Sequence, residues 1–440
     1  MKKEIEAYLD QQAAVFSDLS DKIHGFAELA GEEHRSQKVL CDLLEQAGFS
    51  VERGLGSQPT AFRAAYGSGG VCVGFLAEYD ALPGLNQPPE PYYCGDSSRS
   101  GHGCGHNLLG AGSAAAAIAL KQCLETHHIP GRVVIYGTPA EETLYGKNQL
   151  IADGYFHDVQ AVLSWHPGVE NHCGEFCHKA MHSLELEFRG TTAHASVCPH
   201  LGRSALDACE LTNVGVNYLR EHVPTDVRMH YSYVDLQGKP NVVPGYAKLW
   251  YFIRARRRST ADEVLERVLD VARGAALMTG TAFSHKILAS GSETVINCAL
   301  SRLAYQNMTA IGPPVFDRED MDFARRLAAE SGVGSITGRL SSAIREPEGK
   351  EIEEFGSTDF SDVSQLVPAL ELNTACYAEG TPGHHWTVTA AAKTPIAHKG
   401  MLFAAKVLAC TALDLILSEE TLRQVQAEFA SRKSGLAGRH

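Results

Sequence analysis

The alternation of apolar and polar positions in the N-terminal third predicts helices and strands in turn. Apolar residues recur at helical spacing across residues 3–23 and 36–47, and the run "VCVGFLAEYD" that follows has the character of a buried strand. The alanine-rich helix "AGSAAAAIALKQCLETHH" then precedes the strand "RVVIYGTPAEE", and a further helix precedes the strand "AVLSWHPG". This order predicts an α/β fold with a central, mostly parallel sheet.

The pattern changes near Met181, where "HSLELEFRG" alternates as a half-exposed strand does. A helix over residues 204–222, two strands, a helix over 261–278 and the strand "AFSHKILAS" follow, which is the β-α-β-β-α-β order of a ferredoxin-like unit. The helical pattern returns after about Ile296. We therefore expect a smaller α+β domain, residues 181–296, inserted into a larger domain made of residues 1–180 and 297–440.

Composition limits the class of protein. A chain of 440 residues with 44% hydrophobic content can bury a large core. Its net charge of -13 argues against nucleic acid or an anionic membrane as partner, so we expect a small-molecule partner. No apolar run is expected to reach the roughly 20 residues of a membrane span, and "MKKEIEAYLDQQAAVF" lacks the apolar core of a signal peptide. We expect a cytoplasmic protein in which most of the 12 cysteines are free, buried thiols.

Polar residues follow each of the three predicted strands of the larger domain. Glu78 and Asp80 end the first strand, Glu141 and Glu142 the second, and His166 the third. In open α/β sheets ligands bind beyond the carboxyl ends of the strands. The sequence therefore predicts one site built from these strand ends.

The glycine-rich stretch "GHGCGHNLLG" places Cys104 and His106 two residues apart, a spacing that lets a thiolate and an imidazole bind one ion. Taken alone, the pair favours a glycine turn with a buried thiol over a metal site. Together with "PAEE" and "WHPG" it supplies a thiolate, two imidazoles and two adjacent carboxylates, enough for a metal centre and a separate general base. His398 is a further candidate ligand, and His384 and His385 compete with it.

Several motifs of the chain resemble those of a known family. "AEYDALPGL", "GHGCGHNLLG", "PAEE", "WHP", "AHAS", "NVVP", "GSTDFSDVS" and "AHKGM" occur in this order. Together they resemble the amidohydrolase branch of the aminoacylase/carboxypeptidase metallopeptidases, which includes aminobenzoyl-glutamate hydrolases and auxin-conjugate hydrolases. "PHLGRSALDA" and "EGTPGHHW" look closest to the aminobenzoyl-glutamate side. The resemblance implies a zinc-peptidase-like catalytic domain with two divalent metal ions, Mn2+ or Zn2+, and a lid domain through which a homodimer forms.

The resemblance also implies roles for individual residues. Glu141 matches the general base, and His194 of "AHAS" matches a histidine that reaches into the partner subunit's site and polarises the scissile carbonyl. Asn241 and Arg254 match substrate-contacting positions, and His384 and His385 are further substrate-binding candidates. The matched metal ligands are Cys104, His106, Glu142, His166 and His398. Glu78 stands where many relatives outside this branch have a histidine ligand, so that ligand is expected to be missing here.

The function that follows is hydrolysis of an N-acyl or N-aroyl amino acid, such as aminobenzoyl-glutamate, to a carboxylic acid and a free amino acid. Cleavage of indoleacetyl-aspartate conjugates is one alternative. A dipeptidase of the same fold is another, and it would require a carboxylate near the subsite for the free amine. A non-enzymatic metal-binding or scaffold protein would have lost its base, whereas both glutamates of "PAEE" are present.

Overall fold

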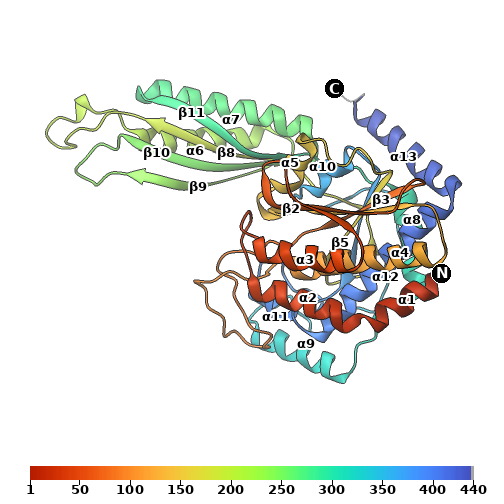
Figure 1. Cartoon of the computed structure of the whole chain (residues 1–440). Coiled ribbons are helices and arrows are strands. Elements are labelled where there is room, and N and C mark those ends of the chain that lie inside the picture. Colours follow the sequence, from red (N-terminus) through yellow and green to blue (C-terminus); the bar gives the residue numbers. More distant parts are fainter. Residues whose placement is uncertain (438–440) are drawn as a thin grey trace. The chain divides into compact units, whose positions relative to one another are not determined.

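The computed structural model describes residues 1–437, and these fall into two compact units (Figure 1). The first unit consists of Met1–Phe176, Val295–Ile352 and the described chain from Asp362 onward, and the second of Cys177–Thr294 and Glu353–Ser361. Residues 353–361, expected in the larger domain, group with the inserted unit instead. The reason is local hydrogen bonding, because Arg254 Nη1 donates to Ser357 Oγ and Lys179 N donates to Gly356 O.

A seven-stranded sheet forms the centre of the first unit, in the order β1-β2-β4-β3-β5-β13-β6. The four central strands β4, β3, β5 and β13 run parallel, and the strands beyond them pair antiparallel. This confirms the predicted mostly parallel sheet. The strands are β1 (Ser50–Leu55), β2 (Gln58–Tyr66), β3 (Cys72–Ala77), β4 (Arg132–Gly137), β5 (Ala161–Gly168), β6 (His172–Cys173) and β13 (Ala369–Ala375).

Two long helices, α4 and α12, pack against each other and against the central strands. α4 contacts β3, β4 and β5, and its alanine-rich sequence lets it approach them closely, since almost all of its side chains are buried. The helices of this unit are α1 (Lys2–Gln11), α2 (Ala13–Phe26), α3 (His34–Gln46), α4 (His106–Thr126), α5 (Gly146–Ala152), α8 (Cys298–Ile311), α9 (Arg318–Glu330), α11 (Trp386–Ala391), α12 (Pro395–Leu417) and α13 (Glu419–Ala437). β7 (Phe176–Cys177), β12 (Ile352–Glu353) and α10 (Phe360–Ser364) lie where the chain passes between units.

The helix α12 corrects the expectation that no apolar run reaches the length of a membrane span. It has 23 residues, its most apolar window has a mean hydropathy of 1.9, and 72% of that window is buried inside the protein. It contacts α1, α4, α8, β5 and β13. A long, largely apolar helix suits a protein core as well as a membrane, and here neighbouring helices and strands contact it.

The single N-terminal helix expected over residues 3–23 is two helices, α1 and α2, separated at Gln12. Gln12 has φ -96° and ψ 7°, outside helical geometry. No glycine or proline marks this break in the sequence, so periodicity alone could not locate it. The break lets Ile5 and Leu9 of α1 and Phe16 and Ile23 of α2 all enter the same core.

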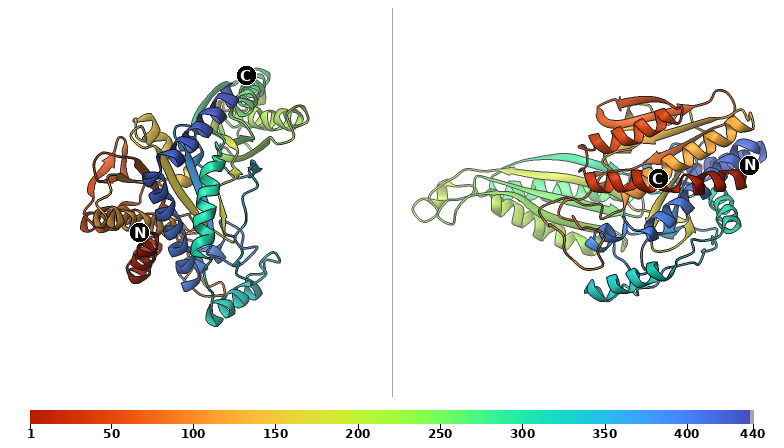
Figure 2. Two further views of the ribbon diagram at one scale, coloured as in Figure 1. Left: turned by 90° about the vertical axis from the view of Figure 1, so that its right-hand side faces the viewer. Right: turned by 60° about the horizontal axis from the view of Figure 1, so that its bottom comes forward.

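The second unit has the predicted β-α-β-β-α-β order, with a four-stranded antiparallel sheet in the order β11-β8-β10-β9. Both helices pack on one face of this sheet, which the two views in Figure 2 also show. Alternate residues of β10, among them Leu249, Tyr251 and Ile253, are buried under the helices, while Trp250 on the other face is 40% exposed. The elements are β8 (Ala180–Arg189), α6 (Ala205–Leu219), β9 (Arg228–Gln237), β10 (Tyr246–Ala255), α7 (Arg258–Thr279) and β11 (Ala282–Gly291).

Candidate metal centre

The ends of three neighbouring strands carry the polar residues of the candidate site. β4, β3 and β5 are adjacent in the sheet, and β3 leads directly into Glu78 and Asp80. A 3-10 turn, η1 (Glu141–Thr143), follows β4, and His166 lies near the end of β5. Because carboxyl ends of parallel strands share one edge of a sheet, side chains distant in sequence meet there.

Cys104 and His106 reach this edge from the loop that opens α4, and Gly105 between them makes a tight turn. Gly105 has φ 81°, a conformation that favours glycine. A Cβ atom at this position would lie 2.0 Å from the hydroxyl oxygen of Tyr377. The turn leaves Cys104 Sγ 3.4 Å from His166 Nε2.

The same separation recurs between other candidate ligand atoms. His106 Nε2 lies 3.4 Å from Glu78 Oε2, and Glu142 Oε2 lies 3.4 Å from His384 Nε2. Ligand atoms about 2.1 Å from a shared ion, arranged tetrahedrally, are themselves about 3.4 Å apart. These pairs are therefore spaced as ligands of common ions would be.

The pairs belong to one continuous cluster. Two buried atoms in it, His106 Nε2 and Glu142 Oε1, have no hydrogen-bond partner within residues 1–437. Leaving such a buried atom unpaired costs about 1–3 kcal/mol, and cations bound in the cluster would give both atoms a partner. The residues thus fit divalent metal ions. Three overlapping groups have ligand atoms within 4.8 Å of one another: Cys104, His106 and His166; Cys104, Glu142 and His384; and Glu78, His106 and Glu141.

Asp80 orients His106 toward the cluster. His106 Nδ1 donates to Asp80 Oδ1 at 2.8 Å, which leaves Nε2 with a lone pair for a metal. Burial disfavours the charged imidazolium, but the neighbouring negative charges of Cys104 and Asp80 raise the pKa of His106 well above its usual value. The surroundings of His106 therefore favour a positive charge, which a metal ion would supply.

Burial also shifts the pKa values of two other members of the cluster. It raises the pKa of Glu142 to about 7 and lowers the pKa of His166 to about 4. His166 Nδ1 donates to the backbone oxygen of Pro167 at 2.9 Å, so its Nε2 is unprotonated and faces Cys104. A neutral imidazole is the form that binds metal.

Two buried carboxylates hold the turn that carries Glu141 and Glu142. Glu33 Oε1 accepts a hydrogen bond from Ala140 N at 2.9 Å, and Asp80 Oδ2 accepts one from Glu142 N at 3.0 Å. The turn is strained, because Ala140 has φ 58° and Leu144 has φ 54°, left-handed values that are costly for non-glycine residues. Glu33 and Asp80 therefore hold the backbone of the turn from which both glutamates project.

The structure does not bring His398 into this cluster. His398 lies on α12, and its Nε2 is 3.0 Å from Asp21 Oδ1 on α2. The position next to Glu142 and Cys104 is taken by His384, which has φ 53° and projects from the loop before α11. The structure thus places His384, rather than the expected His398, beside the other candidate ligands. The sequence could not distinguish the two histidines, because the packing of the chain decides which one reaches the cluster.

His385 has a different position from its neighbour. It is the N-cap residue of α11, where its Nδ1 accepts from Thr387 N, and its ring packs beside Trp386. Trp386 in turn meets the ring of Tyr93 edge-on, with centroids 5.7 Å apart. His385 thus belongs to an aromatic wall and, across the described residues, to none of the three ligand groups.

A cavity of about 290 Å³ opens beside Cys104 and His166. Its walls include the contacting rings of His172 and Phe176, and Glu170 contributes a carboxylate. Within the described chain no lysine or arginine lines it. The lining residues are Gly103, Cys104, His166, Pro167, Gly168, Val169, Glu170, His172, Phe176, Asn373, Tyr377, Thr381, Gly383 and Val388.

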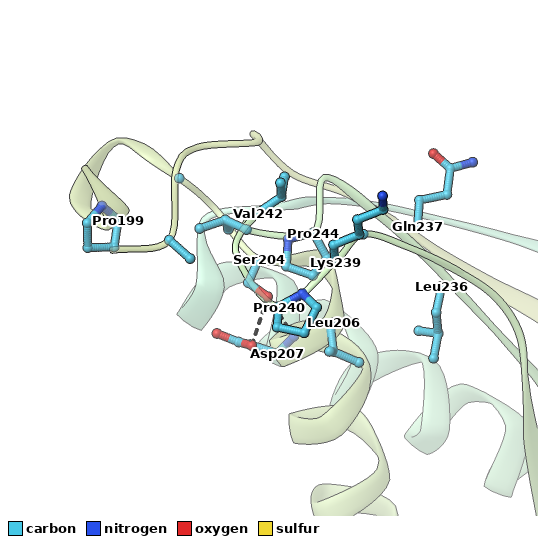
Figure 3. A pocket seen from close by; sticks show the side chains of 14 residues that line it. Pro199, Ser204, Leu206, Asp207, Leu236, Gln237, Lys239, Pro240, Val242 and Pro244 are labelled. Atoms are coloured by element: carbon cyan, nitrogen blue, oxygen red, sulfur yellow. Dashed lines mark hydrogen bonds between the residues drawn. The ribbon is translucent and has the colours of Figure 1, made fainter. Parts of the chain in front are cut away.

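In the second unit, His194 and Asn241 lie together in two exposed loops. Ala195 N donates to Asn241 O at 3.0 Å, and His194 pairs with Val242. His194 Nδ1 accepts from the backbone nitrogens of Ser196 and Val197, so the proton of its ring is carried by Nε2. The loops border an apolar cavity of about 620 Å³, whose lining side chains Figure 3 shows.

Arg254 is far from these loops within the same unit. It lies at the opposite end of β10, where Nη1 donates to Ser357 Oγ. At about 3.4 Å per residue, the strand from Tyr246 to Arg254 covers roughly 27 Å. One small substrate therefore cannot contact Arg254 and the loops of His194 and Asn241 in a single chain.

Two buried residues that the sequence did not indicate belong to this region. Glu33 supports the turn that carries Glu141, and Lys147 Nζ lies 2.7 Å from Glu78 Oε1 with both side chains at most 2% exposed. Neither "GEEHRS" nor "YGKNQL" carries a recognisable motif. A charged residue in a segment of this kind is expected to be exposed to solvent. Only the tertiary contacts of Glu33 and Lys147 show that their side chains are buried.

Comparison with known proteins gives a consistent result. Residues 74–388 match peptidase family M20/M25/M40. Over 445 aligned residues the chain is 37% identical to one of the subunits of the p-aminobenzoyl-glutamate hydrolase of Escherichia coli, covering 94% of this chain and 91% of that protein. It is 32% identical over 445 residues to the Xaa-Arg dipeptidase of Mus musculus, covering 98% and 92%.

A solved structure shares the fold at lower sequence identity. It is a dinuclear metal-binding peptidase of the M20 family from Bacillus subtilis, and it superposes with a TM-score of 0.58 at 18% identity. The match covers 91% of this chain and 99% of that one. At this identity the comparison bears on the fold alone.

Proposed function

The chain belongs to peptidase family M20/M25/M40 and hydrolyses amide bonds, and we propose that its substrates are N-acyl or N-aroyl amino acids of the aminobenzoyl-glutamate kind. The products would be a carboxylic acid and a free amino acid. The observation that carries this proposal is the buried cluster in which His106 Nε2 and Glu142 Oε1 lack partners among the described residues. The relative that hydrolyses p-aminobenzoyl-glutamate supports the substrate class.

The chain's metal-binding character is supported by the ligand groups and by the family, and we propose two divalent ions per chain. Bound ions would act as Lewis acids, polarising the amide carbonyl and lowering the pKa of water toward about 7. Thiolate and imidazole ligands suit zinc, while carboxylates also accept manganese. The proposed ligands are Cys104, His106, Glu142, His166 and His384, the last replacing His398.

Glu141 is proposed as the general base. Its Oε2 lies 4.0 Å from His106 Nε2, farther than the 3.4 Å of the paired ligand atoms, so it faces the cluster without occupying a ligand's place. Glu141 would accept a proton from the attacking water and return it to the leaving nitrogen of the amide. The hydrogen bonds from Ala140 N and Glu142 N hold the turn that bears this carboxylate in place through the reaction.

His194 is proposed to polarise the scissile carbonyl. Because its Nδ1 accepts two backbone hydrogen bonds, its Nε2 carries the proton and can donate to a carbonyl oxygen. Arg254 would bind the substrate carboxylate with its planar guanidinium group. Since β10 separates the two functions by roughly 27 Å, we infer that His194 and Asn241 act on a substrate held by a second copy, in a homodimer formed through the inserted unit.

We further propose a cytoplasmic location. All 12 cysteines are free thiols in the structure, and most are buried. Free thiols persist in reducing compartments. Fractionation of the native cells would test this location directly.

The test of the function is hydrolysis of aminobenzoyl-glutamate, indoleacetyl-aspartate, acetyl amino acids and simple dipeptides by metal-stripped protein, with and without added Mn2+ or Zn2+. Metal-dependent release from the acylated substrates alone is expected. Glu141→Gln should keep the metal content of the wild type and lose about 100- to 10,000-fold in kcat, as expected for loss of a general base. A variant that stays active would refute the base assignment.

A dipeptidase is the second candidate, favoured by the similarity to the Xaa-Arg dipeptidase. The cavity beside the cluster offers one carboxylate, Glu170, and neither lysine nor arginine among its described lining, which suits a substrate portion bearing a positive charge. Cleavage of dipeptides ending in arginine or lysine, with little release from aminobenzoyl-glutamate, would select this function.

A further inference from the structure

Glu78 is a buried carboxylate at the end of β3, next to the proposed ligands. Its side chain is 2% exposed and lies between two buried residues, Lys147 and His106. Oε1 is 2.7 Å from Lys147 Nζ, and Oε2 is 3.4 Å from His106 Nε2. One oxygen is therefore engaged by a cation of the protein, and the other points to a nitrogen that lacks a hydrogen-bond partner among residues 1–437.

We propose that Glu78 is itself a metal ligand, binding through Oε2, and that Lys147 positions it by holding Oε1. The inference rests on the proposed metal centre and adds a ligand to it. Glu78, His106 and Glu141 already have ligand atoms within 4.8 Å of one another. The sequence predicted that a ligand is missing at residue 78 because this residue is not histidine. We propose instead that Glu78 supplies an oxygen ligand there.

The charge of the site supports this role. Four carboxyl groups lie close to the histidines of the cluster, and their side chains are at most 12% exposed. They belong to Glu78, Asp80 and Glu141, which lie near His106, and to Glu142, which lies near His384. Buried carboxylates require hydrogen bonds or cationic partners to offset the loss of solvation. Lys147 balances one of these charges and leaves the remainder for divalent ions.

The position of Lys147 explains why Glu78 would bind through one oxygen. Lys147 lies near the start of α5, just after the turn that carries Glu141, and its side chain is fully buried. An ammonium group this close to Oε1 prevents both oxygens from binding one ion. The carboxylate is thereby held with Oε2 directed at His106.

Glu78 would add an oxygen ligand to the position that contains His106. Carboxylate oxygens favour harder ions such as manganese. The added ligand should therefore strengthen Mn2+ binding at that position.

The test measures metal binding rather than turnover. Wild type, Glu78→Gln and the double variant Glu78→Gln/Lys147→Met are stripped of metal, titrated with Mn2+ by calorimetry, and assayed for bound metal by elemental analysis. The double variant removes both charged partners, which avoids leaving Lys147 buried and uncompensated. Circular dichroism and thermal unfolding establish that each variant is folded.

Wild type is expected to bind two Mn2+ ions per chain. Both variants should keep one ion and bind the second at least about tenfold more weakly, since even residues that only support ligands change metal affinity by about 10- to 100-fold. Glu175→Gln is the matched control, because it also removes the charge of a buried carboxylate. Glu175 accepts hydrogen bonds from Glu348 N and Gly349 N and lies outside the three ligand groups of the described chain. It should bind two ions as wild type does.

The outcomes separate this inference from the function on which it rests. A folded double variant that binds two Mn2+ ions with wild-type affinity overturns the role of Glu78 and leaves the metal-dependent hydrolase intact. A wild-type protein that binds no metal, and hydrolyses amides without it, overturns the proposed function itself. Loss of the second ion in both variants, with the control unchanged, supports Glu78 as a ligand.

Discussion

Replacement of Glu33 by glutamine should change the pH dependence of stability in a defined direction. Glu33 is fully buried, and burial together with the nearby charge of Asp80 raises its pKa from the ordinary value of 4.5 to about 7. In the unfolded chain the carboxyl group ionises near 4.5. Between these two values the folded protein therefore binds more protons than the unfolded chain, and stability falls as the pH rises.

The size of the effect follows from the two pKa values. Each pKa unit corresponds to about 1.4 kcal/mol, so an ionised Glu33 lowers the free energy of unfolding by about 3 kcal/mol above pH 7. Glutamine is neutral at every pH, and its side-chain oxygen can still accept from Ala140 N. Glu33→Gln should match wild type near pH 4.5 and exceed it by up to about 3 kcal/mol at about pH 8.

Urea unfolding followed by circular dichroism, with the metal content of both proteins matched, measures this difference at several pH values. Glu33→Ala is the companion variant, because it removes both the charge and the acceptor for Ala140 N. It should lower kcat while leaving the KM nearly unchanged, since the turn bearing Glu141 is no longer held. A stability difference between Glu33→Gln and wild type that is constant from about pH 4.5 to about pH 8 would refute the argument from burial and Asp80.

Three further predictions concern the cluster and the core. His384→Ala should reduce bound metal per chain in elemental analysis whereas His398→Ala should not, and the reverse result would restore His398 as the ligand. Gly105→Ala should lose metal and stability, because the left-handed backbone disfavours alanine and the added methyl group would collide with Tyr377; unchanged metal content would show that the turn can relax. Leu408→Ala, in the buried helix α12, should destabilise the protein by about 2–5 kcal/mol in urea unfolding without altering the metal stoichiometry, and a loss below about 1 kcal/mol would contradict its place in the core.

Several features are encoded in local patterns. The order of strands and helices in both units follows from hydrophobic periodicity, because a half-buried strand repeats every two residues and a helix about every 3.6. The pairing of Cys104 with His106 in a glycine-rich loop, and the carboxylates after β3 and β4, are short-range signals of chemistry. These signals are sufficient to indicate the family and the amide-bond chemistry.

Other features required the folded chain. Whether His384 or His398 approaches Cys104 depends on how the loop before α11 and the start of α12 pack, since both histidines lie in sequence contexts that suit a ligand. The local sequence does not indicate that Glu33 and Lys147 are buried. The sequence around a charged residue can be the same whether its side chain faces solvent or pairs with another charge. Only the tertiary contact between distant segments distinguishes them.

The order of residues along the chain was thus enough to specify the α/β and ferredoxin-like architecture, the family and the strand ends that carry the site. Folding in three dimensions settled which side chains meet at those ends, how Glu33 and Asp80 hold the turn that carries Glu141 and Glu142, and that Glu78 contacts both His106 and Lys147. The difference arises because secondary structure is encoded by neighbouring residues, whereas the contacts of a buried site join residues from separate parts of the chain.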